Sequence, residues 1–244
     1  MSAPPRPGWR LARLAAVGFC LGVLLRLPCA WMRPLLPQGL RCAQLQGTLW
    51  QGYCGRATWQ GAPLGNVQFG LHPLALLRLR LAADIDLTGP GGEVRGGLVL
   101  GPGHTLRASN VHAVLPLSKA LVSALPGGVH GQLQADLERL ELRSGRVGAL
   151  VGRIDVLHLE TDGEPLGDYR LSFAPTAGTP TGELHDLGGP LDVQAMLRLS
   201  PSGYVLEGRV AARPQAAPDL ARQISFLGSP DAAGRRPFSI AGTF

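Results

Sequence analysis

Apolar and polar residues alternate along much of the chain, and this alternation constrains the fold more than any other feature. In residues 77–88, leucine, alanine and isoleucine fill every second position, and arginine, aspartate and threonine fill most of the others. Because successive side chains of a strand point to opposite faces, the pattern predicts a strand with one apolar and one charged face. The alternation returns in residues 191–199 and again in 204–212. We therefore expect a sheet with one apolar face.

Glycine and proline separate these segments at short intervals. Residues 89–92 read Gly-Pro-Gly-Gly and residues 101–103 read Gly-Pro-Gly, which predicts tight turns between antiparallel neighbours. The apolar phase slips between Ala108 and Val111 and between Leu137 and Leu140, where a β-bulge or a bend would keep the apolar residues on one face. Further strands are expected over 153–160, 169–173 and 238–244. The chain is thus predicted to be all-β, with a mostly antiparallel, meandering sheet.

Two segments show helix signals instead. Ser118 could cap a short helix over residues 118–125, and residues 218–227 begin with Pro218 and are followed by Gly228, a common residue at helix ends. Residues 176–190 are rich in glycine, proline and threonine, and we expect a loop there.

The positive charge is concentrated at the N-terminus. The net charge is +6, and residues 1–41 contain six arginines and no acidic residue, so the rest of the chain is neutral. A DNA-binding or RNA-binding domain needs a clustered basic face. We therefore expect no nucleic-acid partner.

The N-terminal segment is typical of membrane targeting. Residues 1–13 form a short start rich in proline and arginine, and residues 14–32 form an apolar run that only Arg26 interrupts. If Arg26 snorkels to the interface, 19 residues are close to the ~20 that cross a bilayer. A single transmembrane anchor with residues 33–244 exported is favoured over a cleaved signal peptide, whose apolar region would be shorter.

Four cysteines divide between the two parts of the chain. Cys20 and Cys29 fall in the expected anchor, whereas Cys42 and Cys54 belong to the exported part. In an oxidising compartment the latter two could form a disulfide, worth about 3 kcal/mol for so short a loop. Two buried free thiols are the alternative.

Catalytic signatures are missing from the sequence. It contains no nucleophile elbow, zinc-protease motif or phosphate-binding loop, and Lys119 is the single lysine. His185 and Asp186 are the nearest approach to a catalytic pair, and an ordinary exposed loop explains them more simply. We expect no enzyme activity, no cofactor and no metal.

Two motifs near opposite ends resemble a known family. Residues 45–52 read Leu-Gln-Gly-Thr-Leu-Trp-Gln-Gly, residues 64–77 follow with Leu-Gly-Asn-Val-Gln-Phe, and residues 226–244 contain Phe-Leu-Gly-Ser-Pro-Asp. In this order, and after an anchor that ends Leu-Pro-Cys-Ala-Trp, they resemble type II secretion system protein N. The motif residues that we single out are Gly47, Leu49, Trp50, Gly52, Leu227, Gly228, Pro230, Asp231, Gly234, Arg235 and Pro237.

The resemblance implies a non-catalytic component of the general secretion pathway. Such a protein sits in the inner membrane of a Gram-negative cell by one helix, and its periplasmic domain contacts other secretion subunits, such as the outer-membrane secretin or an inner-membrane platform protein. The family also resembles AsmA-like proteins, whose elongated sheets curl into a groove. Because an apolar sheet face must be buried, the sheet either closes as a sandwich or half-barrel or leaves a groove for another molecule. The alternative function is therefore a periplasmic lipid-binding or lipid-transfer module.

In both motifs we expect turns. Gly47 and Gly52 would bracket a tight hairpin in which Leu49 and Trp50 face opposite ways, with one of them packing into the end of the sheet. Pro230, Asp231 and Gly234 would turn the chain between the last helix and the last strand.

Overall fold

A computed structural model describes most of the chain beyond residue 38. The described residues are 18–19, 22–23, 26–30, 39–117, 128–176 and 178–243. The helix expected at 118–125, much of the expected anchor at 14–32, and Phe244 lie outside them. Within these ranges, no helix has both the length and the apolar character needed to span a membrane.

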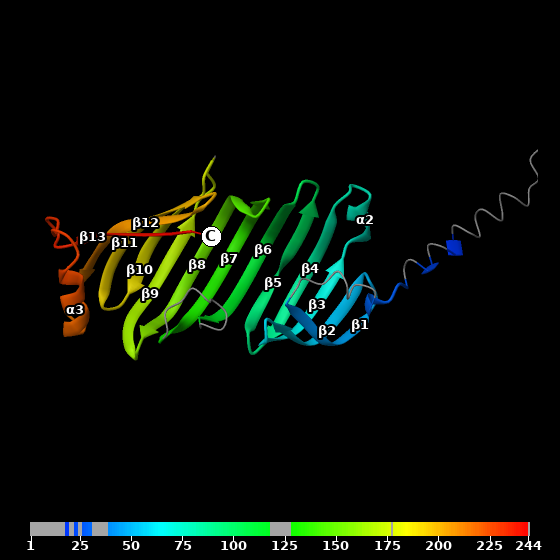
Figure 1. Cartoon of the computed structure of the whole chain (residues 1–244), viewed down its shortest axis with the longest axis horizontal. Coiled ribbons are helices and arrows are strands. Elements are labelled where there is room, and N and C mark those ends of the chain that lie inside the picture. Colours follow the sequence, from blue (N-terminus) through cyan, green and yellow to red (C-terminus); the bar gives the residue numbers. More distant parts are fainter. Residues whose placement is uncertain are drawn as a thin grey trace, which may run out of the picture.

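In the part of the chain that the structure describes, thirteen strands form one sheet. Each strand pairs antiparallel with its neighbours in sequence, so the spatial order runs from β1 to β13 without a crossover (Figure 1). The strands are β1 (Leu40–Gly47), β2 (Gln51–Trp59), β3 (Ala62–Leu71), β4 (Leu81–Gly89), β5 (Gly92–Gly101), β6 (Thr105–Leu117), β7 (Val129–Arg143), β8 (Arg146–Thr161), β9 (Glu164–Phe173), β10 (Thr181–Gly188), β11 (Leu191–Ser200), β12 (Gly203–Ala212) and β13 (Arg236–Thr243). Two short helices, α2 (Pro73–Leu76) and α3 (Pro218–Ser225), accompany the sheet.

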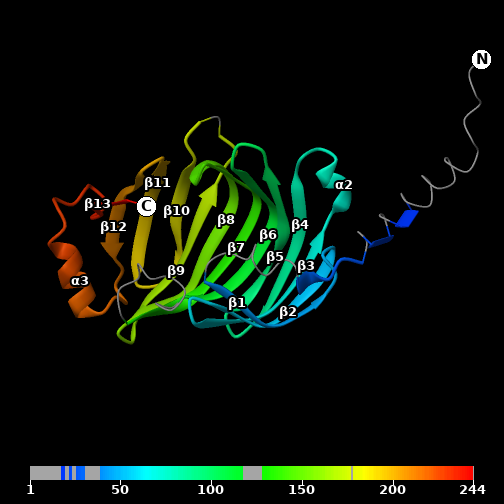
Figure 2. The same cartoon turned by 45° about the vertical axis from the view of Figure 1, so that its right-hand side comes forward.

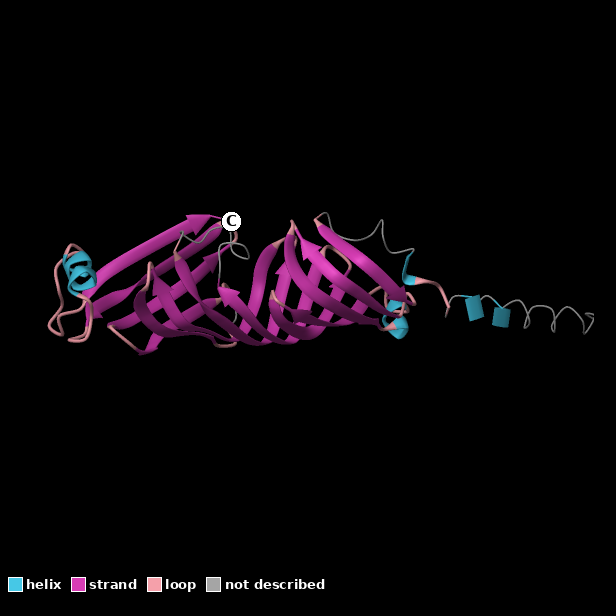
Figure 3. Cartoon of the chain, turned by 90° about the horizontal axis from the view of Figure 1, so that it is seen from below, coloured by secondary structure: helices cyan, strands magenta, loops and turns pink. Residues whose placement is uncertain are grey.

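The sheet is elongated and curled (Figures 2 and 3). Helix α3 lies at the β13 end of the sheet and α2 beside β4 (Figure 1). The prediction of an all-β, antiparallel meander with one or two short helices is confirmed.

The register separates two chemically different faces. His112, Asp136 and Arg153 stand opposite one another on β6, β7 and β8, and the positions beside them hold Ala113, Ala135 and Ile154. Partners in register share a face and neighbours in sequence do not. Ala113 and Ala135 are buried, whereas His112 is exposed. The sheet therefore has one apolar face and one charged face, here called the apolar face and the polar face.

Both predicted bulges are present. The β5–β6 register shifts between Arg95 and Gly97, where Asn110 has a positive φ of 49°, and the β7–β8 register shifts between Leu137 and Arg139. Each shift returns the apolar residues to the same face.

Two expectations were wrong. Residues 77–80 do not belong to a strand, because Pro73 starts helix α2, Leu79 takes a φ of 53°, and the Arg80 N–H donates to Ala75 O at 3.1 Å. Strand β4 begins only at Leu81. Residues 176–190 are not all loop, because Thr181–Gly188 forms β10. This strand pairs with β9 and β11 on its two sides, so the pairing of backbone groups outweighs its weak strand propensity.

Helix α3 covers one end of the apolar face. Ile224 of the helix packs with Val193 of β11 and Val210 of β12, and all three are buried. Leu220, one turn earlier, and Leu227, just beyond the helix, add to this cluster. The predicted helix is confirmed, with its end at Ser225 rather than at residue 227.

Candidate functional site

The turn at residues 47–52 is a tight hairpin between β1 and β2. Gly47 lies opposite Gly52 and has a φ of +100°, and a Cβ at Gly47 would lie 2.4 Å from Gln51 O. The Thr48 N–H donates to Gln51 O at 2.8 Å. Glycine at residue 47 is therefore required by both the backbone conformation and the space.

The tip of this hairpin is held by neighbouring segments. The Leu49 N–H donates to Leu27 O and the Leu71 N–H donates to Trp50 O, both at 2.7 Å, and Thr48 forms a bridge with Pro28. Leu49 and Trp50 are half-buried. The hairpin is therefore part of the packed end of the sheet.

A disulfide joins the first two strands. Cys42 and Cys54 are bonded with their Cα atoms 5.4 Å apart, and Cys54 is buried. Between Cys54 and the end of β2, Arg56 has a φ of 50° and its N–H donates to Asn66 Oδ1 at 3.3 Å. Among the described residues, Cys29 is the free cysteine, and it is also buried.

The motif at the C-terminal end folds around the Asp231 carboxylate. Asp231 Oδ1 accepts the N–H groups of Ala233 and Arg235, each at 2.9 Å, and Oδ2 lies 2.9 Å from Arg209 Nη1. The Arg235 N–H bond, opposed by desolvation and supported by the Ala233 N–H and the nearby arginines, lowers the pKa of Asp231. Gly234 completes the turn with a φ of +77°.

The same motif fastens α3 to β13. Arg236 Nη1 donates to Leu227 O at 3.1 Å and to Gly228 O at 2.6 Å, just beyond the end of the helix. Arg235 Nη1 donates to Gln194 Oε1 at 2.9 Å. A Cβ at Gly228 would lie 3.1 Å from Pro237 Cγ, so helix end and strand are in close contact. Leu227, Gly228, Asp231, Gly234, Arg235 and Pro237 are thus brought together around one turn, and Pro230 immediately precedes its central aspartate.

Acidic side chains of the polar face are held by arginine and histidine side chains, most of them on neighbouring strands. Asp136 Oδ1 lies 2.6 Å from His112 Nδ1, and Asp136 Oδ2 accepts from Arg153 Nη2 at 2.9 Å. The His112 bond and then the Arg153 bond hold the pKa of Asp136 below its ordinary 3.8. Asp155 and Arg170 form a two-pronged pair at 2.7 and 2.8 Å.

Glu141 is, together with Asp155, one of the two most enclosed of these acids. It is only 8% exposed and lies between Arg143, at 2.7 Å, and Arg107, at 3.3 Å. The Arg143 bond lowers the pKa of Glu141 more than burial raises it, and Arg107 adds to the lowering. These carboxylates are therefore fixed in charge pairs that connect strands.

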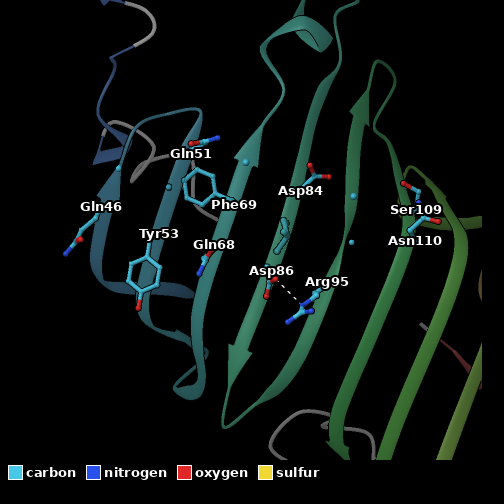
Figure 4. Close-up of a pocket in the computed structure, with 16 residues that line it drawn as sticks. Gln46, Gln51, Tyr53, Gln68, Phe69, Asp84, Asp86, Arg95, Ser109 and Asn110 are labelled. Carbon is cyan, nitrogen blue, oxygen red and sulfur yellow. Dashed lines mark ion pairs between the residues drawn. The ribbon is translucent and has the colours of Figure 1, made fainter.

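A shallow trough of about 960 Å³, with both polar and apolar residues in its lining, crosses β1 to β6 (Figure 4). Side chains of the polar face line it, among them Tyr53, Gln68, Asp84 and Ser109. Asp86 and Arg95 pair across its floor at 3.0 Å, and His72 Nε2 lies 2.8 Å from Asp84 Oδ2. The trough offers charged groups of both signs together with the apolar side chains of Phe69 and Ile85.

His185 and Asp186 do not form a pair. His185 lies opposite Arg170 and Gln194 on the polar face, and Asp186 lies opposite Tyr169 on the other face. Asp186 accepts from the Val193 N–H at 3.0 Å and from Arg213 at 2.6 Å. Burial opposes ionisation of Asp186, but these two bonds outweigh it and lower its pKa. Burial, with Asp186 nearby, raises the pKa of Tyr169 to about 12.

Sequence reasoning placed the two turn motifs and missed the charge pairs. A pair such as Asp136 with Arg153 depends on the register of strands 17 residues apart in sequence, and no local spacing shows it. Within the described ranges, no cluster of three or more His, Cys, Asp or Glu side chains is placed to hold a metal ion.

A family model and two known proteins match nearly all of the residues that form this sheet. The model of the family described as Type II secretion system (T2SS), protein N, matches residues 38–239. "Type II secretion system protein N" of Vibrio cholerae serotype O1 is 29% identical over 232 residues, covering 90% of this chain and 92% of the relative. The protein of the same name from Aeromonas hydrophila is 26% identical over 247 residues, covering 95% and 97%. No solved structure matches the chain significantly.

Proposed function

Because the chain belongs to the type II secretion system protein N family, we propose that it is a non-catalytic inner-membrane component of that system. Residues 14–32 anchor it by one helix, residues 1–13 lie in the cytoplasm, and residues 33–244 form a periplasmic domain. This domain contacts other secretion subunits and so assists protein export across the outer membrane. The observation that carries the proposal is the extent of the family match, which spans residues 38–239 and hence nearly the whole sheet.

The disulfide supports the periplasmic placement. Disulfides persist in oxidising compartments such as the periplasm and are rare in the cytosol. Cys42 and Cys54 lie in the first two strands, directly after the expected anchor. The sheet would therefore begin on the periplasmic side of the inner membrane.

The chemistry of the polar face supports a binding role. Its acids are held at fixed positions by arginine and histidine, as with Asp136 between His112 and Arg153. Such pairs are poor general acids or bases, because a lowered pKa keeps the carboxylate ionised. Rigid charges of alternating sign suit recognition of a complementary protein surface.

Affinity purification tests this proposal. The full-length protein, carrying a tag, would be solubilised in mild detergent from cells that are actively secreting, and co-purifying proteins would be quantified against an untagged strain. We expect enrichment of secretion subunits, with the secretin and the inner-membrane platform proteins as first candidates. A preparation that contains none of them under several detergents would contradict the proposal.

The apolar face favours a second candidate function, the binding of an apolar ligand such as a lipid acyl chain. Leu81, Leu100 and Ile240 are 39%, 48% and 51% exposed, and helix α3 covers only the β11–β12 end. Leu81 and Leu100 lie opposite each other on β4 and β5, and adjacent exposed apolar side chains of this kind are a feature of interaction sites. Native mass spectrometry of gently purified full-length protein should then show bound lipid. A lipid-free spectrum in a detergent that preserves lipid contacts would contradict this function and leave the first untouched.

A further inference from the structure

The same hairpin backbone geometry occurs twice in the chain, 102 residues apart. Residues 60–61 and residues 162–163 form two-residue turns, and both residues of each turn have positive φ. The sequence Pro-Leu-Gly-Asn follows at 63–66, and Pro-Leu-Gly-Asp follows at 165–168. Before each turn the chain kinks at a non-glycine residue, Arg56 with a φ of 50° and His158 with a φ of 52°. Strands β2–β3 and β8–β9 are therefore two copies of one hairpin.

A side-chain bond and a backbone contact repeat with the hairpin. The N–H of Arg56 donates to Asn66 at 3.3 Å, and the N–H of His158 donates to Asp168 at 2.6 Å, each ten residues along the chain. A Cβ at Gly65 would lie 2.5 Å from the Cα of Gly89 in the following hairpin, and a Cβ at Gly189 would lie 2.7 Å from the Cα of Gly167. Both pairs meet backbone to backbone.

The following strands repeat as well. On the apolar face, Val94 of β5 lies opposite Ala113 of β6, and Val193 of β11 lies opposite Val210 of β12. The turns before these strands contain Gly-Pro at 89–90 and at 189–190. The correspondence thus covers β2–β3 with β8–β9 and β5–β6 with β11–β12, which is a spacing of six strands. At the same spacing of six strands, β13, which follows β12, corresponds to β7, which follows β6.

Strands β7 and β13 differ in what lies beyond them. Leu140 of β7 lies opposite Ala108 of β6, and Ile240 of β13 lies opposite Leu206 of β12 at the equivalent place. On its far side, β7 pairs with β8, whereas β13 is the last strand of the described sheet. Ile240 is accordingly 51% exposed.

A hydrogen bond just beyond β12 fixes which backbone groups of β13 point outward. The Arg213 N–H, just beyond β12, donates to Pro190 O on the β11 side at 2.8 Å. Because N–H groups alternate in direction along a strand, the even-numbered residues of β12 point to β13, and Phe238 and Ile240 point back to them. Pro237, Ser239, Ala241 and Thr243 therefore point outward, and Pro237, which has no N–H, sits where an edge strand tolerates it.

The outward edge of β13 carries the usual protection of an edge strand only at its start, where Arg236 and Pro237 lie. Natural edges are commonly blocked by charges, prolines or bulges. Residues 238–243 read Phe-Ser-Ile-Ala-Gly-Thr, with no charge or proline, and the register with β12 runs without a shift. At the other end of the sheet, Leu27 and Pro28 pair with residues beside β1. Beyond Pro237, the β13 edge is thus regular and uncharged, and no strand of the described residues pairs with its outer side.

We propose that the β13 edge binds an extended segment of a partner protein by antiparallel strand addition, the segment taking the place beside β13 that β8 takes beside β7. In β8, Gly152 lies opposite Leu137 and Leu150 lies opposite Leu140. The partner segment should therefore carry a small residue opposite Phe238 and an aliphatic residue opposite Ile240. This inference rests on the proposed function in taking the partner to be another secretion subunit.

Replacement of Ala241 by proline tests the edge. Ala241→Pro removes an outward N–H and places a ring where the added strand would lie, but takes no hydrogen bond from the β12–β13 pair. Ala241→Ser keeps the N–H and serves as the matched control. In affinity purifications of the full-length protein, we expect the proline variant to recover about tenfold less partner than the serine variant. Unfolding midpoints that agree within a few degrees would show that both variants are folded.

A photocrosslinker at Ser239 provides the second measurement, with the same group at Glu207, its neighbour on β12, as the control position. We expect a secretion subunit to be captured from residue 239 more than from residue 207. Equal partner recovery by the proline and serine variants, or capture of a second copy of this chain from residue 239, would overturn the edge proposal. Capture of secretion subunits only from other positions would refute the edge and retain the proposed function. If the proline variant loses capture and the captured partner lies outside the secretion system, the edge proposal would stand and the proposed function would be refuted.

Discussion

The glycine pairs where neighbouring hairpins meet offer the sharpest test of the folded arrangement. In Gly167→Ala, the new Cβ would lie 2.6 Å from Gly188 O and 3.1 Å from Gly189 Cα, and the residue would keep a φ of +98°. Gly163→Ala, four residues earlier in the same hairpin, keeps a φ of +83° with nothing within 4 Å of the Cβ. The two variants therefore share the backbone strain and differ in the clash.

The expected magnitude follows from these two terms. A left-handed backbone costs a non-glycine residue about 1–2 kcal/mol, which is the whole effect expected for Gly163→Ala. Forcing a methyl group against rigid backbone adds about 1–3 kcal/mol, which brings Gly167→Ala to about 2–5 kcal/mol. Since 1 kcal/mol shifts the midpoint of a domain of this size by roughly 2–4 °C, the two variants should be separated by several degrees.

Thermal unfolding of the full-length protein in mild detergent, followed by circular dichroism, measures this difference. The repeat predicts the same contrast between Gly65→Ala, whose Cβ would lie 2.5 Å from Gly89 Cα, and Gly61→Ala, which has nothing within 4 Å. Equal midpoints for Gly167→Ala and Gly163→Ala would refute the close approach of the two hairpins.

Three further predictions concern the turn motif, the disulfide and the charge pairs. Gly234→Val should destabilise the protein by about 1–3 kcal/mol, because Gly234 has a φ of +77°; an unchanged melting temperature would contradict this. Replacing both Cys42 and Cys54 by serine should cost about 3 kcal/mol, and the urea midpoint of the reduced wild type should then coincide with that of the double variant. Folding lowers the pKa of Glu141 below its ordinary 4.5, so its ionised form stabilises the folded state above that pH, and this contribution is lost as the pH falls through the lowered value. The acid-induced fall in melting temperature should therefore be shallower in Glu141→Gln than in Glu138→Gln, an exposed control on the same strand, and parallel curves would refute the pairing with Arg143 and Arg107.

The meander could be predicted from sequence because its signals are local. Alternation places Ile85 and Leu87 on the apolar face, and the phase slip at Ala108–Val111 marks the bulge at Asn110. Local signals failed where neighbouring strands decide the outcome. Strand β10 forms in a segment rich in turn residues because β9 and β11 pair with both of its sides.

The two turns could be predicted from sequence, but the hydrogen bonds that hold them in place could not. Gly47 and Gly234 are glycines at turn positions and were singled out for that reason. The hydrogen bonds that converge on Asp231 from Ala233, Arg235 and Arg209 needed the fold, because Arg209 comes from a different strand. The repeat had a sequence signal, the recurrence of Pro-Leu-Gly-Asn as Pro-Leu-Gly-Asp, which comparison of the chain with itself would have shown.

In-cell photocrosslinking of the full-length protein tests the central claim most directly. Crosslinkers would be placed at exposed positions of the polar face and of the apolar face in secreting cells, and captured proteins and lipids would both be identified by mass spectrometry. The proposed role as a secretion component predicts that secretion subunits are captured, and that capture is lost in cells lacking those subunits. Capture of lipid alone, from the apolar face, would contradict it and would favour a lipid-binding protein instead.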